Sequence, residues 1–178
     1  TELPHEVELW NRNGESIVWV SLPTIGVDSS SEPRMYYGDP NRQIAPRPHD
    51  VWKKHYEIVY HFDETSGATR ATNSANDAHH GLYTGTQPQP AKLGRGRRFS
   101  NAVESTVQIE DSDSIFSGWN GFTYEMWIRP DYPTDTSQID GQHFLDKMPS
   151  GVPSTTPLTG GRLLTAGLNT QNGTNLIN

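Results

Sequence analysis

The sequence predicts an all-β protein in which a small β module precedes an antiparallel β-sandwich. Two observations predict this fold class. Turn-forming residues, among them 16 Gly and 13 Pro, interrupt the chain about every eight to twelve residues, a spacing typical of β-sandwiches. Between these turns lie short stretches of alternating apolar and polar residues, and none has the length and period of an ordinary helix.

The composition indicates a folded chain with a modest, aromatic core. Hydrophobic residues make up 32% of the 178 residues and the mean hydropathy is −0.73, yet the chain contains 5 Trp, 7 Tyr and 5 Phe. This aromatic content is not typical of disordered chains. No apolar run approaches the about 20 residues of a membrane span, so we expect no span in this stretch. The chain starts without Met and ends in a polar tail, and we interpret it as a piece of a longer polypeptide.

The charge and the lack of cysteine exclude several classes of function. A formal net charge of −7 argues against a nucleic-acid partner. Positive charge is grouped only at Arg95, Arg97 and Arg98, which we interpret as a solvated strand end. Because the chain has no cysteine, we expect neither disulfides nor thiolate metal sites.

Residues 1–49 are predicted to form the small β module. Two strands, residues 5–10 and 16–22, flank the hairpin signal Asn13-Gly14 and should pair with each other. A short third strand is expected at residues 34–37, before the turn Gly38-Asp39-Pro40. Residues 50–55 complete a proline-rich linker that ends in a turn or a short helix.

Residues 56–178 are predicted to form the β-sandwich, with a polar tail from about residue 149. Phe122 and Tyr124 share a face with Met126 and Ile128, while Trp127 lies on the other face, so residues 122–128 are predicted to form an inner strand. Residues 63–81 form a long polar loop of the kind that often carries function. The further strand candidates are residues 57–62, 94–99, 106–109, 143–147 and, in the tail, 162–166.

Residues 56 to about 147 resemble the first half of a laminin-G-like, concanavalin A-type jelly roll. The resemblance is carried by Val59-Tyr60-His61-Phe62-Asp63-Glu64, the loop Asn73-Ser74-Ala75-Asn76-Asp77 before His80-Gly81, Leu93-Gly94-Arg95-Gly96, Val107-Gln108-Ile109, and Phe122-Thr123 through Trp127-Ile128-Arg129-Pro130. A complete jelly roll of this type has about twice as many strands. The remaining strands are expected beyond the residues shown or as irregular strands in the tail.

The first module resembles the small domain of unknown function that precedes such lectin-like domains in bacterial and archaeal envelope proteins. The residues concerned are Trp19-Val20-Ser21-Leu22-Pro23, Met35-Tyr36-Tyr37-Gly38-Asp39-Pro40 and Val51-Trp52. The same arrangement occurs in proteins fused to TonB-type proton-channel subunits. The resemblance implies an extracytoplasmic location, in the periplasm, at the cell surface or in secreted form.

The long loop holds a candidate calcium site at Asn73, Asn76 and Asp77. Calcium takes oxygen ligands from carboxylates, amides and backbone carbonyls on loops, and relatives of the resembled fold bind it at this position. The alternative is that these residues only form turns. A transition-metal site at His61, His79 and His80 is less favoured, because adjacent histidines point in different directions.

Three aromatic residues in loops, Trp119, Tyr132 and Tyr83, are candidate platforms for sugar rings. The alternative is that each ring covers an edge of the core. We therefore expect a non-catalytic module that binds a glycan or a cell-surface protein. The second hypothesis is a periplasmic structural or interaction domain of a TonB-type proton-channel protein.

A glycoside hydrolase is a third and less favoured hypothesis. It requires a pair of carboxylates that face one cleft. The acidic stretch at residues 110–113 lacks the spacing that such a pair needs on a strand, and Glu125 has no partner carboxylate on its own strand. The sequence therefore predicts no enzyme.

Overall fold

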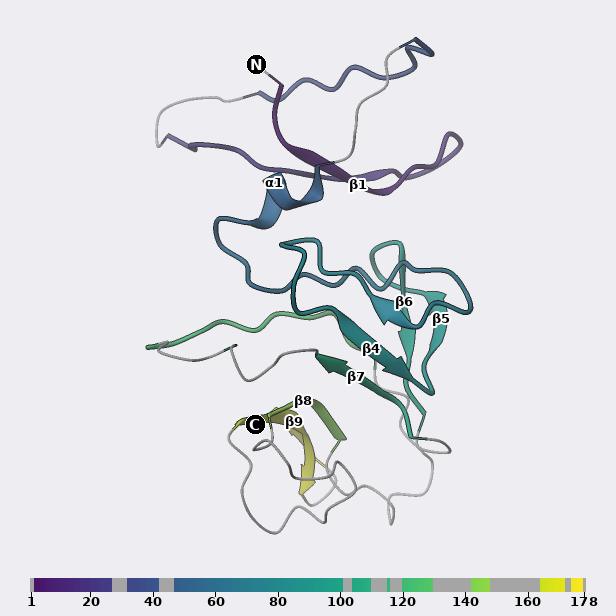
Figure 1. The fold of residues 1–178 in the computed structure, drawn as a ribbon, viewed down its shortest axis with the longest axis vertical. Coiled ribbons are helices and arrows are strands. Elements are labelled where there is room, and N and C mark those ends of the chain that lie inside the picture. The colour runs from purple at the N-terminus through teal and green to yellow at the C-terminus, as the bar shows by residue number, and fades with distance from the viewer. Residues whose placement is uncertain are drawn as a thin grey trace. The chain divides into compact units, whose positions relative to one another are not determined.

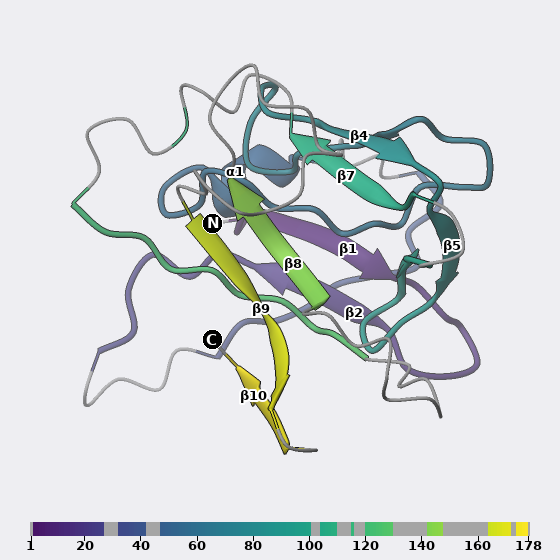
Figure 2. The same cartoon turned by 90° about the horizontal axis from the view of Figure 1, so that it is seen from below.

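The computed structural model describes residues 2–26, 32–41, 47–100, 104–109, 115, 120–129, 142–147, 164–171 and 174–177. The chain divides into two compact units, residues 1–117 and 118–178, and each is described by itself. Antiparallel sheets and one short helix make up the regular structure of the described residues (Figures 1 and 2). The predicted all-β fold class is confirmed.

The first unit begins with the predicted hairpin. Strand β1 (His5–Leu9) pairs antiparallel with β2 (Ile17–Val20), with a bulge between Val7 and Leu9. The connection spans residues 10–16 and is longer than a two-residue turn. Within it the Asn11 N–H donates to Ser16 Oγ at 2.9 Å.

The hairpin turns its acidic face inward. Glu6 and Glu8 on β1 are half-buried against the rest of the unit, whereas Val7 and Leu9 are exposed. Val20 on β2 is exposed as well. The alternation predicts which side chains share a face, and the structure shows that the apolar face is the outer one.

The predicted third strand at residues 34–37 is wrong. The structure describes residues 32–41 without a strand, and Tyr36 and Tyr37 are 83% and 74% exposed. In the described part of the chain the hairpin sheet contains β1 and β2, and residues 32–41 do not pair with either strand. Gly38, with φ of 86°, turns the chain immediately after Tyr37.

The linker was predicted to end in a turn or a short helix, and the structure has the short helix α1 (Pro48–Trp52), which lies against β1 (Figure 1). Pro48 suits the first turn of a helix, where its missing N–H removes no bond. Trp52 is buried and contacts the ring of Trp19 edge-on at 5.2 Å. Residues 1–49, 50–55 and 56–117 thus lie in one compact unit, and the predicted domain boundaries stay predictions.

This unit also contains a three-stranded sheet with the order β3-β4-β7. Its strands are β3 (Arg70–Ala71), β4 (Gly81–Thr84) and β7 (Thr106–Ile109). A second hairpin pairs β5 (Gln87–Pro90) with β6 (Arg95–Arg98) (Figure 1). The strands predicted at residues 94–99 and 106–109 are confirmed as β6 and β7, and the predicted long loop contains β3.

The strand predicted at residues 57–62 is wrong. Phe62 has a φ of 59°, a left-handed conformation that interrupts an extended chain. The structure describes residues 58–62 without a strand. Val59 is held by residues 73 and 74, since its N–H donates to Asn73 Oδ1 at 2.9 Å and its carbonyl accepts the Ser74 N–H at 2.9 Å.

In the second unit, β9 (Leu164–Gln171) pairs on one side with β8 (Gln142–Lys147) and on the other with β10 (Thr174–Ile177). The strand predicted at residues 143–147 is confirmed by β8, and β9 covers residues 164–166 of the strand predicted at residues 162–166. The polar tail from about residue 149 therefore contains regular strands, and β10 was not predicted.

The predicted inner strand at residues 122–128 is wrong. The structure describes residues 120–129 without a strand, and the segment is exposed throughout, with Trp127 at 72%. An inner strand has ladder partners on both sides, and the β10-β9-β8 sheet does not include this segment. The described sheets contain two or three strands each, so the jelly roll itself stays a prediction.

Gly81, on the central strand β4, allows the first test of this packing. A Cβ at this position would lie 2.4 Å from Val107 Cγ1 and 3.3 Å from the Ala71 Cβ. We expect Gly81→Ala to lower the free energy of unfolding by about 1–3 kcal/mol through overpacking, as measured by urea denaturation. Gly121→Ala is the matched control, since its Cβ would meet nothing within 4 Å. Equal stability of the two variants would contradict the described packing.

Candidate functional site

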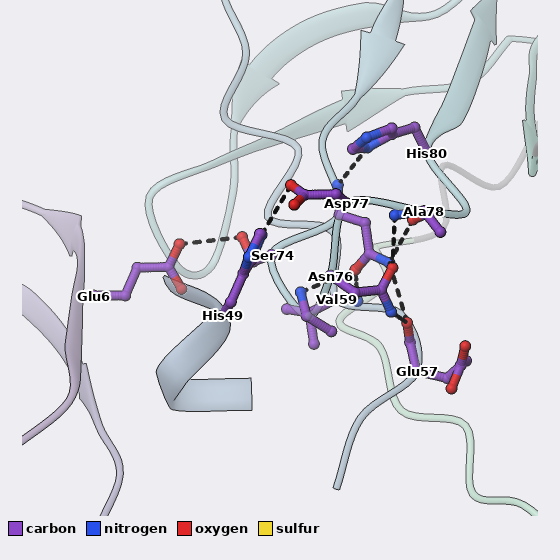
Figure 3. Close-up of polar contacts among 11 residues, drawn as sticks. Glu6, His49, Glu57, Val59, Ser74, Asn76, Asp77, Ala78 and His80 are labelled. Carbon is purple, nitrogen blue, oxygen red and sulfur yellow. Dashed lines mark hydrogen bonds and ion pairs between the residues drawn. The ribbon is translucent and has the colours of Figure 1, made fainter. Parts of the chain in front are cut away.

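We call residues 73–77 the Asn73 loop, and it is organised around the buried side-chain amide of Asn73. Figure 3 shows the neighbouring residues Ser74, Asn76 and Asp77. Asn73 is 1% exposed, and its Oδ1 accepts the backbone N–H groups of Val59 and Ala75 at 2.9 and 3.0 Å. Its own N–H donates to His80 Nδ1 at 3.1 Å, which fixes that ring nitrogen as an acceptor. The side-chain oxygen of Asn73 thus accepts hydrogen bonds from the backbone.

The amide nitrogen of Asn73 faces three oxygens. Asn73 Nδ2 lies 3.0 Å from the Glu57 carbonyl oxygen, 2.9 Å from the Ala78 carbonyl oxygen and 3.1 Å from Asn76 Oδ1. Asn76 in turn donates from Nδ2 to the same Glu57 carbonyl at 2.9 Å and accepts the Ala78 N–H at 2.8 Å. Two side-chain amides therefore replace ladder hydrogen bonds in a loop with little regular structure.

The structure brings together two of the three residues predicted to bind calcium. Asn73 and Asn76 are hydrogen-bonded to each other, and each Oδ1 already accepts a backbone N–H. The Asp77 side chain is 93% exposed, and its Oδ1 lies 3.6 Å from His49 Nε2 (Figure 3). Among the described residues, no three His, Cys, Asp or Glu side chains group in a way that could hold a metal ion. The calcium site stays a prediction.

A second cluster, which sequence reasoning missed, joins the first hairpin to the rest of the unit. We call it the His61 cluster, and it consists of Glu6, Glu8, Trp19, Trp52 and His61. His61 Nδ1 contacts Glu8 Oε2, and His61 Nε2 lies 3.2 Å from Glu6 Oε2. The side chains of His61, Glu6 and Glu8 are all largely buried.

Two indoles and a hydroxyl complete the shell of these carboxylates. Trp19 Nε1–H donates to Glu8 Oε2 at 2.8 Å, and Trp52 Nε1–H donates to Glu6 Oε2 at 2.5 Å. Ser74, in the Asn73 loop, donates from Oγ to Glu6 Oε1 at 3.1 Å (Figure 3). The shell links β1, β2, α1 and the loop.

The carboxylates decide the protonation of the His61 cluster. Burial lowers the pKa of His61, but contacts with Glu6 and Glu8 outweigh it and raise the pKa from 6.5 to about 10. Burial also raises the pKa of Glu6, but His61, Trp52 and Ser74 together hold it below its ordinary 4.5. At neutral pH an imidazolium therefore bridges the two strand carboxylates.

Tyr83, one of the predicted sugar platforms, is engaged inside the protein. Its hydroxyl donates to Glu64 Oε2 at 2.5 Å, and the Arg97 guanidinium lies over its ring at 3.9 Å from the centroid. Burial and then the Glu64 carboxylate raise the pKa of the Tyr83 hydroxyl. Phe62 contacts the same ring at 6.3 Å between centroids, so the ring of Tyr83 packs against protein groups.

Arg97 contradicts one prediction. The structure leaves Arg95 and Arg98 exposed, but the Arg97 side chain is buried. It donates from a terminal nitrogen to the Glu64 carbonyl at 3.2 Å, because a buried cation needs acceptors and counter-charge. The interpretation of all three arginines as a solvated strand end is therefore wrong for Arg97.

The other two predicted platforms, Trp119 and Tyr132, lie outside the described residues. The structure instead reveals exposed aromatic rings in the first unit. The rings of Trp10 and Tyr37 meet edge-on, with centroids 5.8 Å apart, and both are exposed. We call this pair the aromatic corner. The turn residues around both rings are a signal that sequence reasoning could have used.

The pKa of His61 leads to a prediction on pH dependence. The folded chain binds this proton more tightly than the unfolded chain, so its stabilisation is fully present below pH 6.5 and is lost as the pH rises through about 10. We expect the free energy of unfolding to fall between these pH values more steeply in the unmodified chain than in His61→Gln. Urea denaturation at a series of pH values measures both slopes. Parallel slopes would show that His61 is not the bridging group.

Asn73→Asp tests the loop and the calcium prediction together. A carboxylate oxygen would face the three oxygens that now accept hydrogen bonds from Nδ2. We therefore expect the free energy of unfolding, measured in chelator, to fall by about 2–4 kcal/mol. Asp77→Asn is the control, because this exposed side chain should change stability by less than about 0.5 kcal/mol. If the predicted calcium site forms, calcium should raise the melting temperature of the unmodified chain relative to chelator. An unchanged melting temperature would contradict the predicted site.

Comparison with known families finds one match. Residues 1–77 match the model of a domain of unknown function, DUF2341, and the match covers β1, β2, α1, β3 and the Asn73 loop. No similar curated protein and no similar solved structure was found. The match supports the predicted small β domain of unknown function at the start of the chain, and it extends through the residues that surround His61.

Proposed function

We propose that this chain is a non-catalytic binding module that recognises a glycan or another surface molecule outside the cytoplasm. The observation that carries the proposal is the exposure of large apolar and aromatic side chains in the described residues 7–26 and 32–41, where Trp10 and Tyr37 lie in contact. The exposed side chains there are Val7, Leu9, Trp10, Val20, Leu22, Ile25, Met35, Tyr36 and Tyr37.

These side chains are exposed although the mean hydropathy of the chain is −0.73. The buried apolar residues of the described part are Trp52, Ala71, Ala75 and Ile115, so the core is small. Full burial of a large apolar side chain stabilises by about 1.5–3 kcal/mol relative to exposure. Grouped exposed rings therefore favour a partner that covers them.

The engaged carboxylates support a role without catalysis. Glu6 and Glu8 bind His61 and two indoles, and Glu64 binds Tyr83 and the Thr72 N–H. A glycoside hydrolase needs two carboxyl groups that face the substrate instead.

One observation favours the alternative, an interaction domain of a TonB-type proton-channel protein. The outer face of the β1–β2 hairpin presents Val7 and Val20 to solvent, and a protein partner would cover such a face. The extracytoplasmic location rests on the same resemblance. No described helix is long and apolar enough to cross a membrane.

A glycan-array screen of the full chain, in calcium and in chelator, tests the proposal. We expect binding to at least one class of glycan in both buffers, with a thermal melt of each sample as the folding control. Absence of binding by a folded chain would favour the interaction domain. Binding in calcium alone would support the predicted metal site.

A further inference from the structure

The aromatic corner brings together two rings from distant parts of the chain. Trp10 follows β1, and Tyr37 lies in the irregular segment 32–41. Their ring centroids are 5.8 Å apart at an interplanar angle of 61°, yet the residues remain 47% and 74% exposed. The contact therefore orders the two rings without burying them.

The edge-on geometry leaves ring faces open to a ligand. In such a contact the edge of one ring meets one face of the other, because the ring edge is positive and the face negative. A stacked pair would cover a face of each ring. The remaining faces at this corner are not used by the contact between Trp10 and Tyr37.

Tyr37 immediately precedes a hydrogen-bonded turn. Gly38 adopts a φ of 86°, which suits glycine and strains other residues. The next residue, Asp39, accepts the Asn41 N–H with Oδ1 at 2.9 Å and so closes an Asx turn.

Trp10 is also held by a hydrogen-bonded loop. The neighbouring Asn11 donates its N–H to Ser16 Oγ at 2.9 Å, and its Oδ1 accepts the Asn13 N–H at 3.0 Å. Ring positions fixed before binding reduce the entropy that a ligand must offset. Both turns thus pre-organise the corner.

We infer that the aromatic corner binds the pyranose ring of a glycan, an inference that rests on the proposed binding function. The C–H face of a pyranose is apolar and slightly positive, so it stacks on the negative face of an aromatic ring. Its hydroxyl groups need polar partners, and the exposed Asn11, Arg12 and Asp39 lie close to the two rings in sequence.

The charge of the chain disfavours the other common stacking ligand. A nucleobase on a nucleic-acid strand brings phosphates, which bind basic surfaces. The formal net charge here is −7, and Arg97, the buried arginine of the described residues, already pairs with Glu64. A neutral sugar ring fits this corner better.

Calorimetric titration of the full chain with cello-, xylo-, manno- and chito-hexaose tests the inference. We expect Trp10→Ala and Tyr37→Ala each to weaken binding of the recognised oligosaccharide by about tenfold or more. Tyr36→Ala is the matched control, because Tyr36 is the same residue type, adjacent and 83% exposed. It should weaken binding by less than about twofold. Trp10→Phe keeps a ring and should retain most of the affinity even where Trp10→Ala fails to fold.

The outcomes separate the inference from the proposed function. If the unmodified chain binds an oligosaccharide and both alanine variants bind it equally well, the corner is not the site, although the binding function stands. An equal loss in Tyr36→Ala would also overturn the assignment. If the folded unmodified chain binds none of the four probes, the inference is overturned, whereas the proposed function is decided by the glycan-array screen.

Discussion

The first unit depends on one ion bridge, the imidazolium of His61 between the carboxylates of Glu6 and Glu8. A largely buried charge without a partner costs several kcal/mol, so the two strand carboxylates require the imidazolium and the indole donors that surround it. This requirement sets the orientation of the first hairpin. Because acidic residues occupy the inward positions of β1, the alternating apolar residues must face outward. The exposed Val7 and Leu9 and the buried Glu6 and Glu8 thus follow from one alternating pattern in β1.

Polar contacts also replace much of the regular backbone pairing in this unit. The Asn73 and Asn76 amides satisfy backbone groups of residues 57–78 that no ladder reaches. Such contacts are directional, and a buried polar group left without its partner is costly. They therefore define one arrangement of the loop with little apolar burial, which fits a chain whose mean hydropathy is −0.73. The small core leaves large rings in solvent, where they are free to contact a ligand.

The sequence predicted the elements whose signals are local. β1 and β2 alternate around a turn, and β7 lies in a short apolar and polar alternation, so their positions could be derived from nearby residues. Residues 57–62 alternate equally well, but the left-handed Phe62 and the distant Asn73 determine their conformation. The strand prediction for residues 122–128 was wrong for a related reason, since an inner strand requires partners far along the chain. The candidate site followed the same division: the Asn73 loop was recognised as important, whereas the His61 cluster unites residues that no short motif connects.

The contact between Glu6 and Ser74 spans 68 residues, and this separation has a consequence for synthesis at the ribosome. Loop-closure entropy opposes such distant contacts until the intervening chain has formed its own structure. The first hairpin emerges early with its acidic face still in water, and it acquires its counter-charge only when His61 has left the exit tunnel. The N-terminal strands therefore dock late, although they are made first. A nascent chain arrested before residue 61 would carry the hairpin sequence without the group that anchors it.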